Sequence, residues 1–293
     1  MNWRDFRIWG QLPALTIMAL ALIVPICIVL LVSFGTRGSY GGFSFGLSPA
    51  AYQKILFAED WSGNLGFNPQ YLIIIGRTVT LALLTTLFCL ILAFPVAYYI
   101  ARQKPEVKSV LIYLVTLPFW VSMIVRVYAW LIILGNGGLV DRLLLALGLI
   151  SQPGGILFTN TAMLIGLVYS YIPLMILPVF ASIEKLDPAL VEASHDLYGG
   201  RWTTLRRVIV PGAWPGLMAG AVLVFVPALG SVLEPILLGG GKVMMMGNLI
   251  QRQFGGDRDW PFGSAIALCL MAVVIIVLTI NAQRAARQER LAA

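Results

Sequence analysis

The polar residues that could do chemistry are concentrated in one short segment, residues 192–216, which reads EASHDLYGGRWTTLRRVIVPGAWPG. It holds two acids, three arginines, four glycines and the only histidine of the chain. His195 lies beside Asp196, but no cysteine or second histidine stands near it to complete a metal site or a nucleophile–base pair. The sequence therefore predicts no catalytic residue, no metal site and no cofactor bound by this chain. All three cysteines lie within apolar runs and have no CxxC partner: Cys27, Cys89 and Cys269.

The rest of the 293-residue chain is strongly apolar. Hydrophobic residues make up 59% and charged residues only 11%, with a mean hydropathy of +0.88. A soluble domain carries about 25% charged residues, so lipid is the expected solvent for most of the surface. The net charge of +7 comes from basic residues that flank apolar runs. Because these residues form no stripe, a nucleic-acid partner is not expected.

Six apolar stretches are long enough to cross a bilayer, which takes about 20 residues each. The first is expected to be a retained span, because its apolar run is too long for a signal peptide and no clean cleavage site follows it. The fold class predicted is therefore all-α, a polytopic membrane protein of six transmembrane helices. The expected spans lie near 11–34, 71–100, 109–134, 161–182, 214–238 and 262–281.

The distribution of lysine and arginine predicts the orientation of these spans. Most of the 20 basic residues fall on one side if the N-terminus is cytoplasmic. Residues 1–10 are then a cytoplasmic N-terminus, 11–281 the six-span domain and 282–293 a cytoplasmic tail. The loop 183–213, which carries the polar segment, is also cytoplasmic.

The polar segment is predicted to form a helical hairpin at the inner membrane surface. Asp187 can cap a helix that begins at Pro188 and runs to about Tyr198. Gly199 or Gly200 can take the left-handed conformation that ends it. A second helix, RWTTLRRVIV, follows and is expected to stop at Pro211. Two interpretations stay open from the residues alone, an interfacial anchor of the bundle or a docking surface for a cytoplasmic partner.

This segment resembles the "EAA" loop of ABC-importer permeases. In that family, the short helix of the loop fits a cleft of the ATPase subunit and couples ATP hydrolysis to gating. Ser194 replaces the second alanine of the pattern, and Tyr198 stands where the family usually has glycine, with Gly199 one place later. The resemblance implies a coupling role for seven residues: Glu192, Ala193, Ser194, Leu197, Gly199, Arg201 and Pro211.

Further stretches resemble the B-type permease subunit of spermidine/putrescine importers. They are TLPFW (116–120), IVRVYAW (124–130), GLVY followed by SIEKLD (166–187) and RDWPFG (258–263). The resemblance implies the type I permease fold, location in a bacterial inner membrane, a second permease subunit, two ATPase subunits and a periplasmic or lipid-tethered substrate-binding protein. ATP and Mg would bind the ATPase, since this chain has no GxxxxGK[ST] and its nearest stretch, GGGKVMMMG, lacks the spacing and the hydroxyl.

Carboxylates and aromatic faces suit the ammonium groups of a polyamine. Glu234 is the best acid for the pathway, and Arg126 is its natural partner. The pair is either structural or a gate or substrate contact. Asp257 and Asp259 either dock the binding protein or belong to a solvated loop. The aromatic candidates for the pathway, which an interfacial belt would also explain, are Trp120, Tyr128, Tyr169 and Tyr171.

Other classes of membrane protein fit the sequence less well. A gradient-driven secondary transporter is expected to show paired acids or histidines deep in its spans and inverted repeats, neither of which is evident. A membrane enzyme needs a cluster of His, Asp or Cys at a membrane face, and a channel needs a filter motif. An importer of another small solute, such as an amino-acid derivative or an opine-like compound, remains the alternative to a polyamine importer.

Overall fold

A computed structural model describes residues 3–59, 65–148 and 154–292 and divides the chain into two compact units. The first contains Met1–Leu72 and Leu249–Val273, and the second contains Ile73–Asn248 and Val274–Ala293. Within the described residues, six helical segments are long and apolar enough to cross a membrane, in agreement with the predicted fold class. They are Pro13–Ser33, Gln70–Ala101, Met123–Ala146, Asn160–Glu184, Arg201–Leu229 and Trp260–Gln283.

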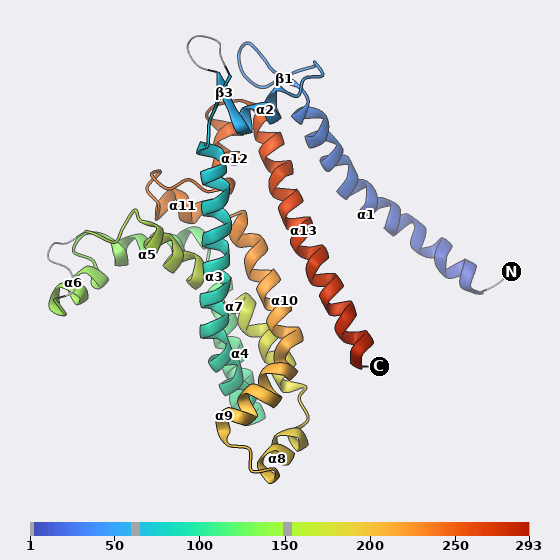
Figure 1. Cartoon of the computed structure of the whole chain (residues 1–293), viewed down its shortest axis with the longest axis vertical. Helices are drawn as coiled ribbons and strands as arrows, with labels where there is room; N and C mark the ends of the chain where they lie inside the picture. The colour runs from blue at the N-terminus through green and yellow to red at the C-terminus, as the bar shows by residue number, and fades with distance from the viewer. Residues whose placement is uncertain (1–2, 60–64, 149–153, 293) are drawn as a thin grey trace. The chain divides into compact units, whose positions relative to one another are not determined.

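The first unit joins a long N-terminal helix to short strands and helices (Figure 1). The helix is α1 (Trp3–Ser33), and no residue in its most apolar stretch is buried against the rest of the chain. Two short antiparallel hairpins follow, β1 (Thr36–Arg37) with β2 (Phe43–Ser44), and β3 (Phe57–Glu59) with β4 (Leu65–Phe67), separated by α2 (Ala50–Leu56). The unit also contains most of α12 (Met246–Gly255) and the first part of α13 (Trp260–Ala292).

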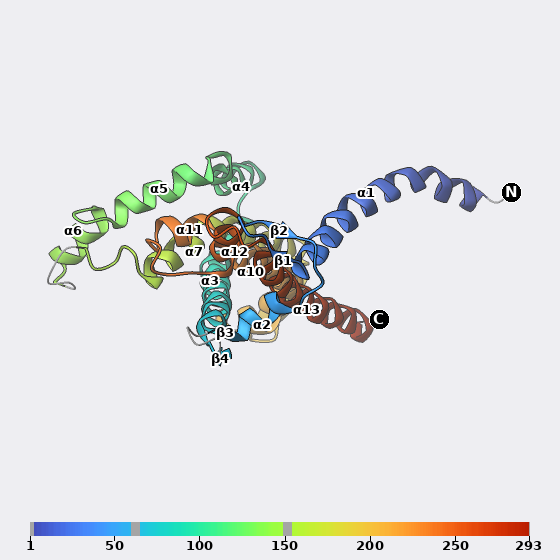
Figure 2. The ribbon, with the colours of Figure 1, turned by 90° about the horizontal axis from the view of Figure 1, so that it is seen from above.

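The second unit contains the other helices, which Figures 1 and 2 show from two directions. The long helix α3 (Gln70–Ala101) precedes α4 (Pro105–Trp120), and α7 (Asn160–Glu184) lies against α10 (Val210–Leu229). In both views α5 (Met123–Leu134) and α6 (Leu139–Ala146) extend sideways from the pair α7 and α10. The short helices α8 (Pro188–Asp196), α9 (Arg201–Thr204) and α11 (Leu233–Leu237) complete the unit.

The predicted third span, 109–134, is not one helix. The chain breaks at Val121 and Ser122, whose ψ angles are 135° and 134°, between α4 and α5. Pro118 lies in the last turn of α4 and removes a helical hydrogen bond there. As a result, the candidate spanning segment in this region is Met123–Ala146, which includes α6. Apolar residues continue through the break, so hydropathy gave no sign of it.

The predicted fifth span, 214–238, also differs from the helix observed there at both ends. Its helix is continuous from Arg201 to Leu229 and stops at Gly230, beyond Pro227 in the last turn. Residues 233–237 form the separate helix α11. Glu234 therefore lies in a short helix outside the fifth span, and not near the end of that span as we expected.

Close approach of α7 and α10 forms the core of the second unit. Three glycines of α10 at four-residue spacing face α7, and a Cβ at any of them would overlap an α7 residue or the chain just after α7. At Gly216 the overlap would be with the Pro178 carbonyl and the Ser182 side chain. Small residues at this spacing let helix backbones approach closely in membranes. The row consists of Gly212, Gly216 and Gly220.

We expect Gly216→Val to separate these two helices and lower the free energy of unfolding by about 1–3 kcal/mol, the usual cost of overpacking. Thermal unfolding of the detergent-solubilised protein measures the effect. Gly76→Val in α3 is the matched control, because a Cβ at Gly76 meets nothing within 4 Å. Equal loss of stability in both variants would contradict the packing argument.

Candidate functional site

The first arm of the hairpin, α8, begins as the sequence predicts. The Asp187 carboxylate accepts a hydrogen bond from the Ala189 N–H at 2.9 Å, and Pro188 occupies the first turn. None of the residues of α8 is buried. Leu190 is 51% exposed and Leu197, just after the helix, is 83% exposed. The apolar stripe of α8 therefore faces away from the rest of the second unit and can contact the surface of another molecule.

The turn after α8 differs from the prediction, because a tyrosine takes the left-handed conformation. Tyr198 has φ of +58° and is fully exposed. The Gly199 N–H donates to the Ser194 carbonyl at 2.8 Å and the Tyr198 N–H to the His195 carbonyl at 3.0 Å. This pair of bonds is a Schellman motif, which requires its left-handed residue at position 198. Gly199 is needed for a different reason: a Cβ there would overlap the Ser194 carbonyl.

Tyr198→Gly is expected to stabilise this turn by about 1 kcal/mol, because an L side chain is strained in the left-handed region and glycine is not. Amide hydrogen exchange at residues 197–200 should slow by about fivefold in the variant. Tyr198→Ala keeps the strain and removes only the ring, so it separates the two effects. If both variants exchange alike, backbone strain at residue 198 does not limit the stability of the turn.

The second arm of the hairpin continues into α10 without the stop that we predicted at Pro211. Between α9 and α10 the chain forms one π-helical stretch, η1 (Leu205–Ile209), and Val210 N–H bonds to the Leu205 carbonyl. A wide turn moves the preceding carbonyls away from a proline ring and tolerates its missing N–H. Pro211 thus lies within a continuous helix.

The two arms are joined by a hydroxyl pair. Ser194 Oγ and Thr204 Oγ1 lie 2.9 Å apart, and Thr204 is buried. Ser194 therefore positions α8 against the second arm. His195 Nδ1 contacts the Gly199 carbonyl at 3.2 Å, which gives this histidine a local structural contact. Of the other predicted coupling residues, those with exposed side chains are Glu192, Ala193, Leu197, Arg201 and Pro211.

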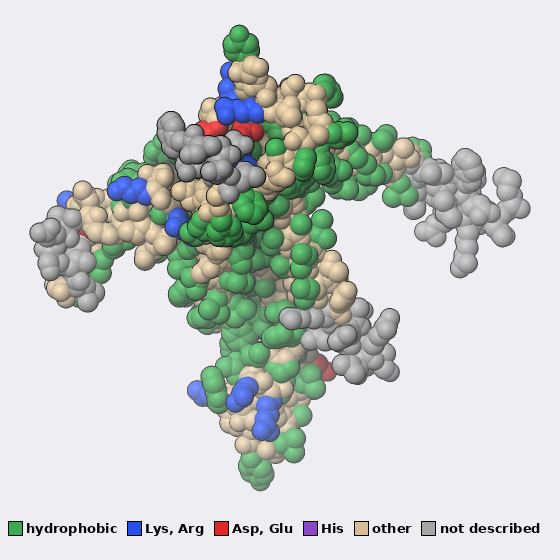
Figure 3. Space-filling view, turned by 45° about the horizontal axis from the view of Figure 1, so that its top comes forward, with side chains coloured by type: hydrophobic (Ala, Val, Ile, Leu, Met, Phe, Trp, Pro, Cys, Tyr) green, Lys and Arg blue, Asp and Glu red, His purple; other side chains and the backbone are tan. Residues whose placement is uncertain are grey.

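Basic side chains surround this hairpin. Figure 3 shows Lys and Arg gathered at the hairpin end of the second unit, beneath a surface of hydrophobic side chains. A surface that combines exposed apolar residues, an acid and arginines suits a protein partner with a complementary cleft. The exposed basic residues in this region are Arg102, Lys104, Lys185, Arg201, Arg206 and Arg207.

A second candidate site is a buried ionic cluster around α11, which packs against α5 and α7. Glu234 is completely buried and accepts a hydrogen bond from Ser231 Oγ at 2.5 Å. Its Oε1 has no hydrogen-bond partner, and neither do Nε and Nη1 of Arg126. Among the described residues, Arg126 and Glu234 do not form the direct ion pair that the sequence suggested. Unsatisfied charged atoms in a buried site are costly, so further polar groups are expected beside them.

Tyr171 belongs to this cluster, but the other predicted aromatic residues do not. Its hydroxyl donates to the Pro227 carbonyl at 3.4 Å, and Glu234, Ser231 and Arg126 all lie close enough to act on that hydroxyl. Tyr169 instead packs edge-on against Trp130, with ring centroids 5.4 Å apart. The other two predicted aromatic residues lie at exposed positions of α4 and α5. Trp120 is 81% exposed and Tyr128 is 49% exposed.

The two acids predicted to dock a binding protein are held by their own unit. Asp259 is 5% exposed, and its carboxylate binds Lys54 Nζ at 2.6 Å and accepts from the Phe262 N–H at 3.2 Å. Asp257 accepts from Gln253 Nε2 at 2.8 Å and lies beside Arg252. These contacts tie α2 to the start of α13. The Asp259 carboxylate is therefore held by contacts within its own unit, and little of it is exposed to a partner.

Two residues of these sites were missed by sequence reasoning. Ser231 holds the buried carboxylate, and Thr204 holds the two arms of the hairpin together. The signal for Ser231 was its position three residues before an acid, at the start of a short helix. Thr204 gave no signal, because its partner Ser194 lies on the other arm.

The fold is that of an ABC-transporter permease. A solved bacterial alginate ABC transporter, in complex with an alginate pentasaccharide-bound periplasmic protein, contains a chain that superposes with a TM-score of 0.74. The two chains are 18% identical, and the match covers 97% of this chain and 95% of that one. At 18% identity, the similarity between the two chains shows a common fold alone.

Residues 91–289 match the family model described as "Binding-protein-dependent transport system inner membrane component", and the chain belongs to this family. The spermidine/putrescine transport system permease protein PotB of Haemophilus influenzae is 37% identical over 259 residues, 87% of each chain. PotB of Escherichia coli strain K12 is 38% identical over 231 residues, 79% of this chain and 84% of the relative. This chain is therefore a multi-pass inner-membrane permease of an ABC importer, as the EAA-type segment predicted.

Proposed function

We propose that this permease admits a small organic cation, most simply spermidine or putrescine, and that the α11 cluster lies on its route. The observation that carries the proposal is the 37–38% identity to PotB permeases over most of the chain. The buried Glu234 supports it, because its partnerless Oε1 is a strong acceptor for an ammonium group. The aromatic ring of Tyr171 beside this acid can add a cation–π contact.

In this proposal the hairpin is the docking surface for an ATPase subunit. Glu192 and Leu197 provide a charged and an apolar contact on the exposed face of α8. ATP and Mg bind the ATPase, two copies of which serve this chain and a second permease subunit. The exposed apolar face of α1 suits a lipid or second-permease contact. A periplasmic or lipid-tethered binding protein delivers the solute, and both termini of this chain are cytoplasmic, as the basic residues suggest.

An amino-acid derivative is the second candidate solute. Arg126 has two buried nitrogens without partners, as Glu234 has one oxygen without a partner. A zwitterion would satisfy both charges at once, whereas a polyamine satisfies only the acid and is repelled by the arginine.

Co-purification tests the assignment. The chain is tagged at its C-terminus, solubilised gently and analysed for what accompanies it. An ATPase with a Walker motif and a second permease are expected, and the reconstituted complex should hydrolyse ATP faster with spermidine and the binding protein. Stimulation by an amino-acid derivative alone would select the second candidate. A chain that purifies alone or only with itself would contradict the proposed docking of an ATPase at the hairpin.

A further inference from the structure

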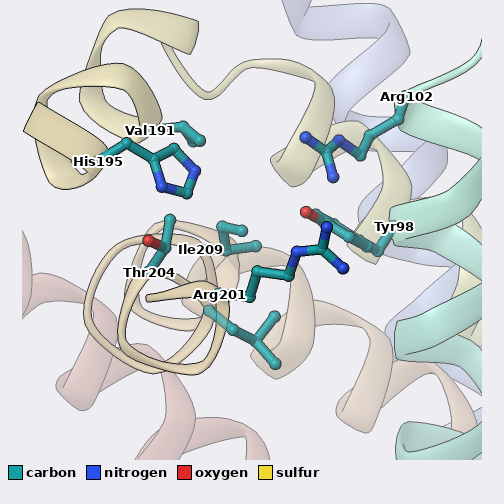
Figure 4. Close-up of a pocket in the computed structure, with 8 residues that line it drawn as sticks. Tyr98, Arg102, Val191, His195, Arg201, Thr204 and Ile209 are labelled. Carbon is teal, nitrogen blue, oxygen red and sulfur yellow. The ribbon is translucent and has the colours of Figure 1, made fainter. Parts of the chain in front are cut away.

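A cavity of about 670 Å³ lies between the end of α3 and the hairpin. The wall from α3 is formed by Tyr98 and Arg102, and the wall from the hairpin includes His195 and Arg201. Figure 4 shows the Tyr98 hydroxyl between the Arg102 and Arg201 guanidinium groups, with the His195 imidazole facing them across the open space. None of these groups belongs to the buried α11 cluster.

Two arginine side chains, Arg102 and Arg201, line the cavity without a counter-ion in the described part of the chain. The side chains of Arg102, Arg201 and His195 are exposed at its rim. Among the side chains that the structure describes, no carboxylate forms an ion pair with either arginine. The nearest compensating contact is the Tyr98 ring, whose centroid lies 5.1 Å from the Arg102 guanidinium carbon. Two converging guanidinium groups repel each other unless an anion lies between them.

We propose that this cavity binds the phosphate headgroup of an anionic phospholipid. Guanidinium groups bind phosphate oxygens through paired N–H donors. The Tyr98 hydroxyl, between the two arginines, adds a third donor. The bound headgroup joins the end of α3 to the hairpin, and so ties the predicted docking element to a membrane helix.

The position of the two arginines selects a lipid over a soluble anion. Arg102 follows directly after the candidate span Gln70–Ala101, and Arg201 begins the candidate span Arg201–Leu229. Both therefore lie where apolar helix meets water, at the depth of headgroups. Basic pockets between membrane helices on the cytoplasmic side are known to select anionic headgroups. The remaining lining is largely apolar and can accept the glycerol and upper acyl chain: Val191, Leu205 and Ile209.

Native mass spectrometry of the purified protein, with any subunits that accompany it, tests this proposal. After delipidation, the protein is titrated with phosphatidylglycerol, with phosphatidylcholine of the same acyl chains, and with inorganic phosphate. Wild type should retain phosphatidylglycerol in preference to phosphatidylcholine, and Arg102→Gln should weaken that retention about fivefold, the effect of one basic side chain. Lys104→Gln is the matched control, because Lys104 is exposed nearby but does not line the cavity.

Three results would overturn the proposal. Equal phosphatidylglycerol retention by wild type and Arg102→Gln would show that the cavity does not bind the headgroup. Equal retention of both lipids would show that the site does not select an anion. Displacement of phosphatidylglycerol by millimolar inorganic phosphate would identify a soluble anion as the occupant. None of these readouts depends on the transported solute or on ATP hydrolysis, so failure here is distinguishable from failure of the proposed function.

Discussion

Glu192→Lys is expected to reduce solute uptake by more than about a hundredfold while the protein still inserts into the membrane. Glu192 lies on the exposed side of α8, where no residue is buried, so the substitution leaves the packing of the permease intact. Under the proposed function, its effect falls on the ATPase subunit that docks there. A like charge opposed to a basic group across an interface costs several kcal/mol, and each 1.4 kcal/mol is a factor of ten in binding.

The measurement is uptake of labelled spermidine by cells in which the variant replaces the wild type, with membrane fractions quantified in parallel. Glu106→Lys is the matched control, because Glu106 is an exposed acid in the first turn of α4, outside the hairpin. The control should transport normally. Normal uptake by Glu192→Lys would remove α8 as the docking element.

The second large effect is expected at the buried acid of α11. Glu234→Gln keeps an oxygen that can accept from Ser231 but loses the negative charge. If the carboxylate contacts an ammonium group of the solute, uptake should fall by about tenfold or more, the value of a hydrogen bond to a charged group. Thermal stability should change little, because the variant also relieves a buried charge with a partnerless oxygen.

A double variant separates a solute contact from a structural role. If Glu234 only balances the charge of Arg126, the neutral pair Glu234→Gln with Arg126→Gln should recover the uptake lost by the single variant. If Glu234 contacts the solute, the double variant stays as inactive as Glu234→Gln alone. Recovery in the double variant would therefore contradict a solute-binding role for Glu234.

Local signals in the sequence were sufficient for the membrane class and for the start of the hairpin. The six apolar stretches depend on composition over about 20 residues, and the cap at Asp187 depends on a neighbour two residues away. The EAA-type pattern needed only the order of residues 192–211. These features are local, so a single sequence contains them.

The helix breaks and the side-chain contacts that build the sites could not be predicted from these local signals. Hydropathy averages over the interruption at Val121 and over the end of α10 at Leu229, since the flanking residues remain apolar. The ion pair between Lys54 and Asp259 joins residues that are 205 positions apart in the sequence. The left-handed tyrosine contradicts the usual preference for glycine, because the two bonds of the turn fix which position must be left-handed. Only the contact between Lys54 and Asp259 depends on residues far apart in the sequence; the other differences arise from local backbone geometry that hydropathy and residue preference do not report.

The unbroken helix from Arg201 to Leu229 also has a mechanical consequence. Its 29 residues form a rod about 43 Å long at 1.5 Å per residue. One end begins in the hairpin, and the other stops two residues before Ser231, the donor to Glu234. A rigid tilt of about 10° around the midpoint of such a rod displaces each end by about 4 Å. A rod of this kind transmits a displacement at the hairpin to its other end, beside the buried acid.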